Sequence, residues 1–156
     1  MSFFGIQISL MAHVLFGVFG FVLAVATFVY VLNINEKNIA AIRKLSILVP
    51  LFTILSYVIG GWWYVVYYPH ERNIIKSGSW VWAHTFFMEV KEHLFFILLM
   101  LTILLPIVIY KNDLIMDKNN RNLVLTILAL IVLLGLSMEG AGAIISRGVI
   151  VGYMGM

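Results

Sequence analysis

Residues 80–110 read WVWAHTFFMEVKEHLFFILLMLTILLPIVIY and decide the fold class of the chain. The second half of this stretch is almost purely apolar, which is typical of a helix that crosses a membrane. The first half contains the ionisable side chains His84, Glu89, Lys91, Glu92 and His93. Each of these groups is costly to place in hydrocarbon unless it has a partner or a function. The stretch therefore predicts a membrane helix that carries a polar site.

The composition of the whole chain agrees with a membrane protein. Of its 156 residues, 63% are hydrophobic and 11% are charged, whereas a soluble domain carries about 25% charged residues. The net charge of +3 does not indicate nucleic-acid binding, because the basic residues lie in short segments between apolar runs. The chain has no cysteine, which excludes disulfides, thiolate metal sites and cysteine-linked haem. No basic segment precedes the first apolar run, so we expect that run to be retained rather than cleaved as a signal peptide.

Four apolar runs are long enough to cross a bilayer, which takes about 20 residues in a helix. They cover approximately residues 8–32, 45–67, 82–110 and 123–149. Lipid permits only helices or closed barrels, and these runs are too long for membrane strands. Because the connections are short, consecutive helices should be antiparallel. The prediction is an all-α, polytopic membrane protein in which residues 1–156 form one domain, an antiparallel bundle of four transmembrane helices.

The loops predict the orientation of this bundle. The first and third loops together hold six Lys or Arg residues, and the opposite side holds three. By the positive-inside rule, we expect a multi-pass protein of the cytoplasmic (inner) membrane with both termini outside. Aromatic side chains crowd the expected outer end, as in an interfacial belt. They include Trp62, Trp63, Trp80 and Trp82.

Small residues and one histidine share a face of the first helix. His13, Gly17, Gly20, Ala24 and Thr27 are spaced by four, three, four and three residues, which aligns them on one side. Two interpretations have about equal weight. The face is either a seam that packs against a neighbouring helix, or a groove in which a flat group lies with the imidazole holding one end.

The third helix carries most of the ionisable groups. In an uninterrupted α-helix, His84 and Lys91 fall on one face, Glu89 and His93 fall four residues apart on a neighbouring face, and Glu92 lies between them. A polar arc this wide is expected to face the bundle interior. The pair spaced by four is close enough to hydrogen-bond or to bind one metal ion. The alternative is a charge network that only fixes the position of the helix.

The fourth helix adds one acid among small residues near its end. Glu139 is the only charge in this helix before Arg147, and it shares a face with Gly135 and Gly142. Chain direction places it at the same end as His13 and the polar part of the third helix. The opposite half of the bundle has no comparable groups, which disfavours a continuous polar channel.

The predicted function is binding of b-type haem for electron transfer, with quinone or proton chemistry beside it. Non-covalent haem in a bundle needs histidines on different helices and small residues where the porphyrin passes the backbone. The first helix supplies one histidine, and the third helix offers two for the other side. Candidate haem-binding residues are His13, Gly17, Gly20, His84, His93 and Arg147, the histidines as metal ligands. Candidate catalytic or proton-carrying residues are Glu89, Lys91, Glu92 and Glu139.

Two segments carry a resemblance that supports haem. MAHVLFGVFG (residues 11–20) has a histidine early in the first helix, and WAHTFFMEVKEHLFF (residues 82–96) opens the third with a Trp/His-plus-Lys pattern. Here the chain resembles a superfamily of small four-helix membrane proteins that includes the bacterial haem-binding protoporphyrinogen oxidase and copper-resistance protein D families. In the oxidase family the helix-one histidine and helix-three lysine are the functional pair, which implies that role for His13 and Lys91. The acids of the third and fourth helices depart from the pattern, so the resemblance implies the architecture and the haem but not the reaction.

Two alternatives stay open. The first is a non-haem iron, copper or zinc site with mixed carboxylate and imidazole ligands, drawn from His13, Glu89, His93 and Glu139. The second is a small membrane subunit of a respiratory complex whose acids serve proton or quinone traffic. All readings place the chain in the lipid bilayer. Because no soluble catalytic domain is expected, electrons would come from a quinone, a redox protein or a larger assembly.

Overall fold

The computed structural model of the protein describes residues 3–155, and the side chains of residues 8–155. The elements are α1 (Phe3–Leu32), α2 (Ile39–Val66), α3 (Tyr68–Ser77), η1 (Ala83–Met88), α4 (Glu89–Lys111) and α5 (Lys118–Met154). Four segments are long and apolar enough to cross a membrane, namely Ile8–Leu32, Ile39–Val66, Ala83–Lys111 and Lys118–Met154. The predicted all-α bundle of four membrane helices is therefore confirmed.

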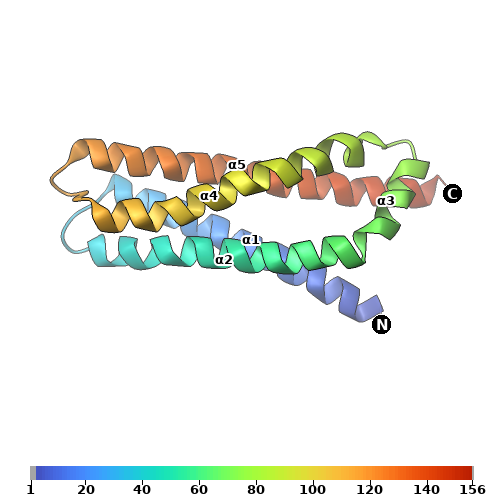
Figure 1. Ribbon diagram of the computed structural model, residues 1–156, viewed down its shortest axis with the longest axis horizontal. Helices are drawn as coiled ribbons and strands as arrows, with labels where there is room; N and C mark the ends of the chain where they lie inside the picture. Colours follow the sequence, from blue (N-terminus) through green and yellow to red (C-terminus); the bar gives the residue numbers. More distant parts are fainter. Residues whose placement is uncertain (1–2, 156) are drawn as a thin grey trace.

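The long helices run side by side, with consecutive ones antiparallel (Figure 1). One end of the bundle, which we call the terminal end, holds α3 and both ends of the described chain. The other end, which we call the loop end, holds the connections 33–38 and 112–117. α1 packs mainly against α2, and α5 packs against both α1 and α4.

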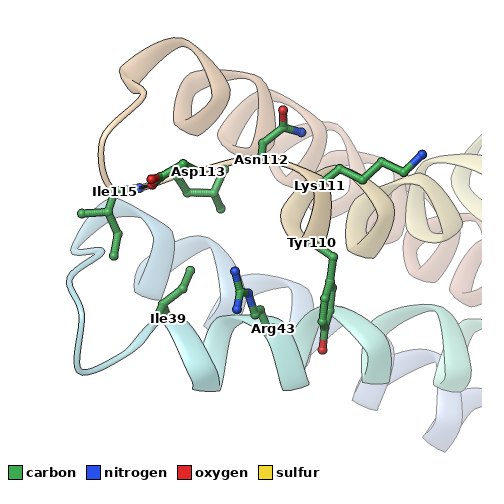
Figure 2. Close-up of a pocket in the computed structure, with 8 residues that line it drawn as sticks. Ile39, Arg43, Tyr110, Lys111, Asn112, Asp113 and Ile115 are labelled. Atoms are coloured by element: carbon green, nitrogen blue, oxygen red, sulfur yellow. Dashed lines mark hydrogen bonds between the residues drawn. The ribbon is translucent and has the colours of Figure 1, made fainter.

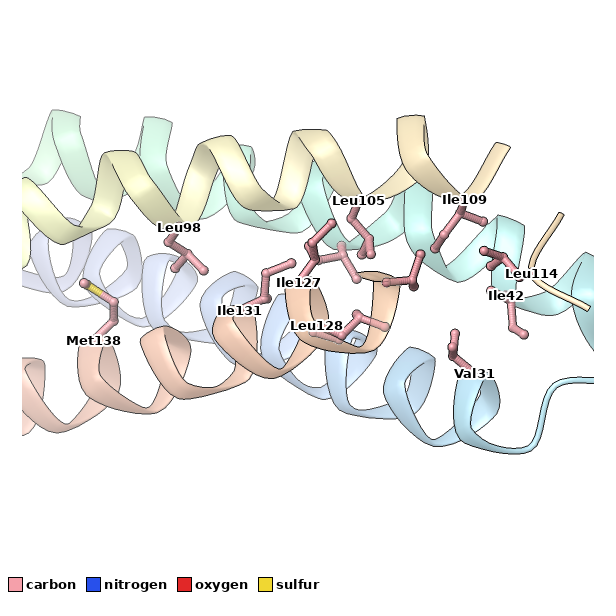
Figure 3. Packing of buried hydrophobic residues seen from close by; sticks show 13 residues of the cluster. Val31, Ile42, Leu98, Leu105, Ile109, Leu114, Ile127, Leu128, Ile131 and Met138 are labelled. Atoms are coloured by element: carbon pink, nitrogen blue, oxygen red, sulfur yellow. The ribbon is translucent and has the colours of Figure 1, made fainter. Parts of the chain in front are cut away.

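The loop half of the bundle is an apolar core. Leu105, Ile109 and Leu128 are fully buried there, and Figure 3 shows them among the side chains that fill the space between the helices. The buried hydroxyls of Thr27 and Thr53 each donate to a carbonyl of their own helix, at 2.7 and 2.9 Å. Polar atoms in this half are thus satisfied locally, and they form no connected path among the described residues.

The outward-facing surface of the long helices is also apolar. Val65 and Met100 are each 72% exposed and Leu133 is 62% exposed. A soluble monomer rarely presents a continuous apolar surface of this kind. These side chains are therefore expected to contact lipid, as the composition predicts.

The second connection contains a short helix that the pattern of apolar runs does not predict. α3 begins with Pro69 in its first turn, a position that needs no backbone donor. Its apolar side chains are buried, with Tyr68 1%, Ile74 4% and Ile75 0% exposed. It lies close against α5, where a Cβ on Gly152 would stand only 2.7 Å from Cγ2 of Ile74. This close packing makes α3 a cover over the terminal end of the bundle.

A π-helical segment corrects the expected arrangement of the third membrane helix. η1 occupies Ala83–Met88 and continues directly into α4. A π turn takes more residues than an α turn, so the 100° spacing used from His84 onward does not hold across it. Lys91 and Glu92 are partly buried, as expected, but Glu89 and His93 are exposed. The prediction that this last pair faces the bundle interior is therefore wrong.

Candidate functional site

Ionisable side chains from three membrane helices meet near the terminal end. Lys91 of α4 and Glu139 of α5 are close enough to interact electrostatically, and so are Lys91 and His13 of α1. A Cβ on Gly17 would lie 3.1 Å from Oε1 of Glu139 and 3.3 Å from Oγ of Ser56, which places α2 at the same point. We refer to His13, Ser56, Lys91 and Glu139 as the charged cluster.

Glycines provide the space that the charged cluster occupies. A Cβ on Gly142 would lie 3.2 Å from Nζ of Lys91, so the ammonium occupies space that is open because residue 142 is glycine. The imidazole of His13 lies flat against Gly60, since a Cβ there would be 2.6 Å from Cε1 and 3.0 Å from Cγ. The small residues of these helices are therefore required by the polar side chains that face them.

His13 is oriented by α2. Its Nδ1 lies 2.8 Å from the carbonyl oxygen of Ser56, and the Ser56 hydroxyl donates to the carbonyl of His13 at 2.9 Å. A proton on Nδ1 satisfies the Ser56 carbonyl and leaves Nε2 with a lone pair. Nε2 is then the nitrogen that can accept a proton or bind a metal.

The depth of the charged cluster follows from helix geometry. His13 precedes Leu32 by about 19 residues, and Lys91 precedes Tyr110 by the same number. At a rise of 1.5 Å per residue, both lie about 28 Å from the loop end. The hydrocarbon core is about 30 Å thick, so the cluster lies near its terminal-end boundary.

A second polar group lies between the charged cluster and α3. The Tyr64 hydroxyl hydrogen-bonds to the carboxylate of Glu92. The Tyr68 hydroxyl and Nδ1 of His84 share a hydrogen bond at 3.0 Å. The two tyrosine rings stack with centroids 5.2 Å apart. We refer to Tyr64, Tyr68, His84 and Glu92 as the tyrosine group. Burial raises the pKa of Tyr68, so its hydroxyl stays protonated at neutral pH and can donate.

Three buried polar atoms around the tyrosine group have no hydrogen-bond partner in the described part of the chain. They are Nε1 of Trp63, Nε of Arg72 and Oε1 of Glu92. Arg72, on α3, also interacts electrostatically with Tyr64 and Tyr68. Buried polar atoms of this kind are normally satisfied by ordered water. The terminal half thus holds polar groups that need water, whereas the loop half does not.

The remaining predicted residues lie outside these two groups. Glu89 and His93 are exposed, and Nδ1 of His93 bonds to the Glu89 backbone carbonyl at 2.7 Å rather than to its carboxylate. Arg147 is exposed on α5. Gly20 is buried against α2, where a Cβ would be 3.3 Å from Oγ1 of Thr53.

The packing around α1 tests whether haem fits the predicted groove. Ser56 and Glu139 fill the space beside Gly17, and Thr53 fills the space beside Gly20. This face is therefore a packing seam, and a porphyrin lying along it does not fit the described arrangement. Among the described residues, no three His, Asp or Glu side chains are grouped so that they could hold a metal ion.

Sequence reasoning identified His13, Lys91 and Glu139 but missed their surroundings. Ser56 lies in the second apolar run, four residues before Gly60, and nothing in its spacing predicts a polar contact with the first helix. Tyr64 lies beside Trp62 and Trp63 of the predicted belt, and its contact with Glu92 on another helix cannot be inferred from spacing. Comparison with protein-family models, curated proteins and solved structures gave no match.

Proposed function

We propose that this membrane protein takes part in electron transfer that is coupled to proton exchange, with the charged cluster as the site of proton binding. One observation carries the proposal. His13, Lys91 and Glu139 meet at the inner limit of a polar terminal half, and an apolar loop half lies beyond them. Protons can therefore reach the cluster from one end of the bundle only.

Adjacent residues of α4 connect the two polar groups. Lys91 faces the charged cluster, and Glu92 bonds to Tyr64 in the tyrosine group. Beyond them, at the terminal end of the bundle, lies α3, which carries Arg72 and the buried Tyr68. We infer that a proton enters beside α3, is held by Glu92, and passes to His13 or Glu139. When Lys91 is protonated, its charge beside Glu139 limits the cost of ionising that carboxyl in a membrane.

A charge network without function is the competing interpretation. Buried ion pairs contribute little stability because desolvation offsets their attraction, and intramembrane charges are usually functional. Glu139, on the interior side, would be needed for proton exchange, whereas the exposed Glu89 would not. These two glutamates therefore form a matched pair for a test.

The test is infrared difference spectroscopy of the purified protein between oxidised and reduced states. We expect reduction to change a protonated-carboxyl band, and we expect Glu139→Gln but not Glu89→Gln to remove that change. Extraction and chromatography of the bound small molecules identify the electron carrier, a quinone or a haem. A preparation that holds no redox-active group, or a carboxyl band that Glu139→Gln leaves intact, would contradict the proposal.

We also propose b-type haem as the carrier, with His13 as a ligand, because of one specific observation. The bond from Nδ1 to the Ser56 carbonyl is the arrangement that ligating histidines usually show. Because Ser56 and Glu139 close the Gly17 face, a haem on His13 would have to lie outside that face, and it would supply only the electron-carrying group. A pyridine haemochrome assay decides this point. Full haem content in His13→Ala would exclude His13 as a ligand, and a negative assay on the unmodified chain would exclude haem.

A further inference from the structure

A cavity of about 360 Å³ lies at the loop end, far from the charged cluster. The start of α2, the end of α4 and the connection that follows it form its walls (Figure 2). Arg43, Tyr110 and Asp113 supply ionisable and aromatic side chains to it, and Lys111 lines its edge with its side chain extending away from Arg43 (Figure 2). The cavity has no role in the proposed proton exchange, and it lies in the half of the bundle that is otherwise apolar.

The cavity has an excess of positive charge. Both cations, Arg43 and Lys111, are exposed, and neither has a carboxylate partner among the described residues. Arg43 is held over the ring of Tyr110, with its Cζ 5.6 Å from the ring centroid. Figure 2 shows its side chain rising from α2 toward the connection. The guanidinium therefore keeps its hydrogen-bond donors available for an anion.

The one acid that lines the cavity is already engaged. Oδ1 of Asp113 accepts the backbone N–H groups of Ile115 and Met116, each at 3.0 Å. These two bonds hold the Asp113 carboxylate against the backbone of the turn in the connection. Asp113 thus shapes the wall of the cavity without neutralising the two cations.

The position of the cavity defines the class of anion. Directly below it, Ile42 and Ile109 are fully buried, whereas Ile47 and Ile103 are 48% and 43% exposed on the outer surface. Tyr110 and Lys111 end α4, as expected at the boundary between hydrocarbon and lipid headgroups. A ligand seated here has a polar cavity above it and an apolar helix surface beside it.

We propose that this cavity binds the phosphate group of an anionic membrane lipid. The planar guanidinium of Arg43 offers two parallel hydrogen bonds to phosphate oxygens. Lys111 at the edge of the cavity supplies a second positive charge when its four-carbon side chain turns toward the phosphate. The acyl chains lie along the exposed apolar surface of α2 and α4. Basic pockets at the ends of membrane helices bind such headgroups in this way.

Native mass spectrometry of the full chain in detergent tests the proposal, with phosphatidylglycerol and phosphatidylcholine of the same acyl chains as probes. We expect phosphatidylglycerol to bind more tightly. The double variant Arg43→Gln/Lys111→Gln should lower its affinity about a hundredfold, because each charge-assisted hydrogen bond contributes about tenfold. The control Lys37→Gln/Lys44→Gln removes the same charge outside the cavity and should stay within about threefold.

Two outcomes would overturn the lipid assignment. The first is that both double variants lose affinity equally, or that phosphatidylglycerol binds no more tightly than phosphatidylcholine. Either result would mean that lipid binding depends on diffuse surface charge and not on the cavity. The second comes from an arm in which inorganic phosphate is added without lipid. If phosphate alone binds and depends on Arg43 and Lys111, the cavity serves a soluble phosphate compound. Equal melting temperatures of the two double variants ensure that folding does not account for the difference.

Discussion

Ser56 and His13 make three polar contacts across the interface of α1 and α2. The hydroxyl of Ser56 donates to the backbone carbonyl of His13 at 2.9 Å, and its oxygen lies 3.0 Å from Nδ1 of the imidazole. The carbonyl of Ser56 lies 2.8 Å from the same Nδ1. Through these contacts α2 sets both the position of the α1 backbone and the direction of the ring. The orientation of His13 therefore depends on a residue 43 positions away in the chain.

Replacing Ser56 by alanine removes the two contacts of its hydroxyl and keeps that of its carbonyl. We expect Ser56→Ala to lower the free energy of unfolding by about 1–2 kcal/mol, because hydrogen bonding across the helices is lost. Thermal unfolding in detergent micelles measures the change. Ser46→Ala is the control, since Ser46 is fully buried but donates to a carbonyl of its own helix, that of Arg43, at 2.8 Å. Equal effects of the two variants would show that the contact across the helices adds nothing.

Two adjacent glycines of α2 give a sharper test of the His13 site. A Cβ on Gly60 would collide with the imidazole, whereas a Cβ on Gly61 meets nothing within 4 Å. We expect Gly60→Ala to cost about 1–3 kcal/mol through overpacking. Gly61→Ala should be neutral or stabilising, because alanine is the better helix former. Melting temperatures of both variants check this, and a neutral Gly60→Ala would place His13 elsewhere.

The Lys91–Glu139 pair predicts a non-additive response to mutation. Glu139→Leu leaves the ammonium of Lys91 without its neighbour in an apolar setting, and we expect a loss of about 3 kcal/mol. The double variant Lys91→Met/Glu139→Leu removes both charges and should recover most of that loss. Unfolding free energies of the two single variants and the double variant form a double-mutant cycle. Additive effects would mean that the two side chains do not interact.

The pH dependence of α3 docking follows from Glu71. Burial raises the pKa of this carboxyl from 4.5, and His70 partly opposes the shift. The folded state therefore holds the proton more tightly, so the stabilisation present below pH 4.5 is lost as pH rises through the folded pKa. We expect the protection factors of the α3 amides, which correct for the intrinsic pH dependence of exchange, to be higher at pH 4 than at pH 7. Glu71→Gln should raise the protection factors at pH 7 and remove the difference between the two pH values. Unchanged protection factors in this variant would exclude Glu71 as the cause.

Much of the fold could be predicted because lipid imposes a simple rule. Each membrane helix needs a long apolar run, and such runs are visible in one sequence. α2 and α5 begin before the predicted spans because charged side chains such as Arg43 and Lys118 near their N-terminal ends lower the hydropathy there. α3 was missed for a related reason. It is short, and its buried residues Ile74 and Ile75 are few among polar ones.

The site was only partly predictable, and the reasons are geometric. His13, Lys91 and Glu139 stand out as polar residues in apolar runs, so each could be identified from its own segment. Their contacts depend on how each of the four helices is rotated about its own axis, and this rotation could not be predicted from the sequence. Glu89 and His93 lie two residues before and after Lys91 in the regular helix α4, which places each about 160° around the helix from it, so they face outward when Lys91 faces inward. The hydrogen bond between Tyr64 and Glu92 joins two helices, and the periodicity of neither helix predicts it.

The length of α5 has a consequence for how the protein sits in membranes of different thickness. Its 37 residues extend about 55 Å, whereas the hydrocarbon core measures about 30 Å. The two ends of α5 therefore cannot both lie at the membrane surfaces, and helix length does not fix the immersion depth. That depth is left to interfacial anchors such as Trp62 and Trp82 at one end and Tyr110 at the other. In a thicker or thinner bilayer the whole bundle can tilt, or shift along the direction of α5, relative to the membrane. The charged side chains between the helices keep their mutual arrangement when it does.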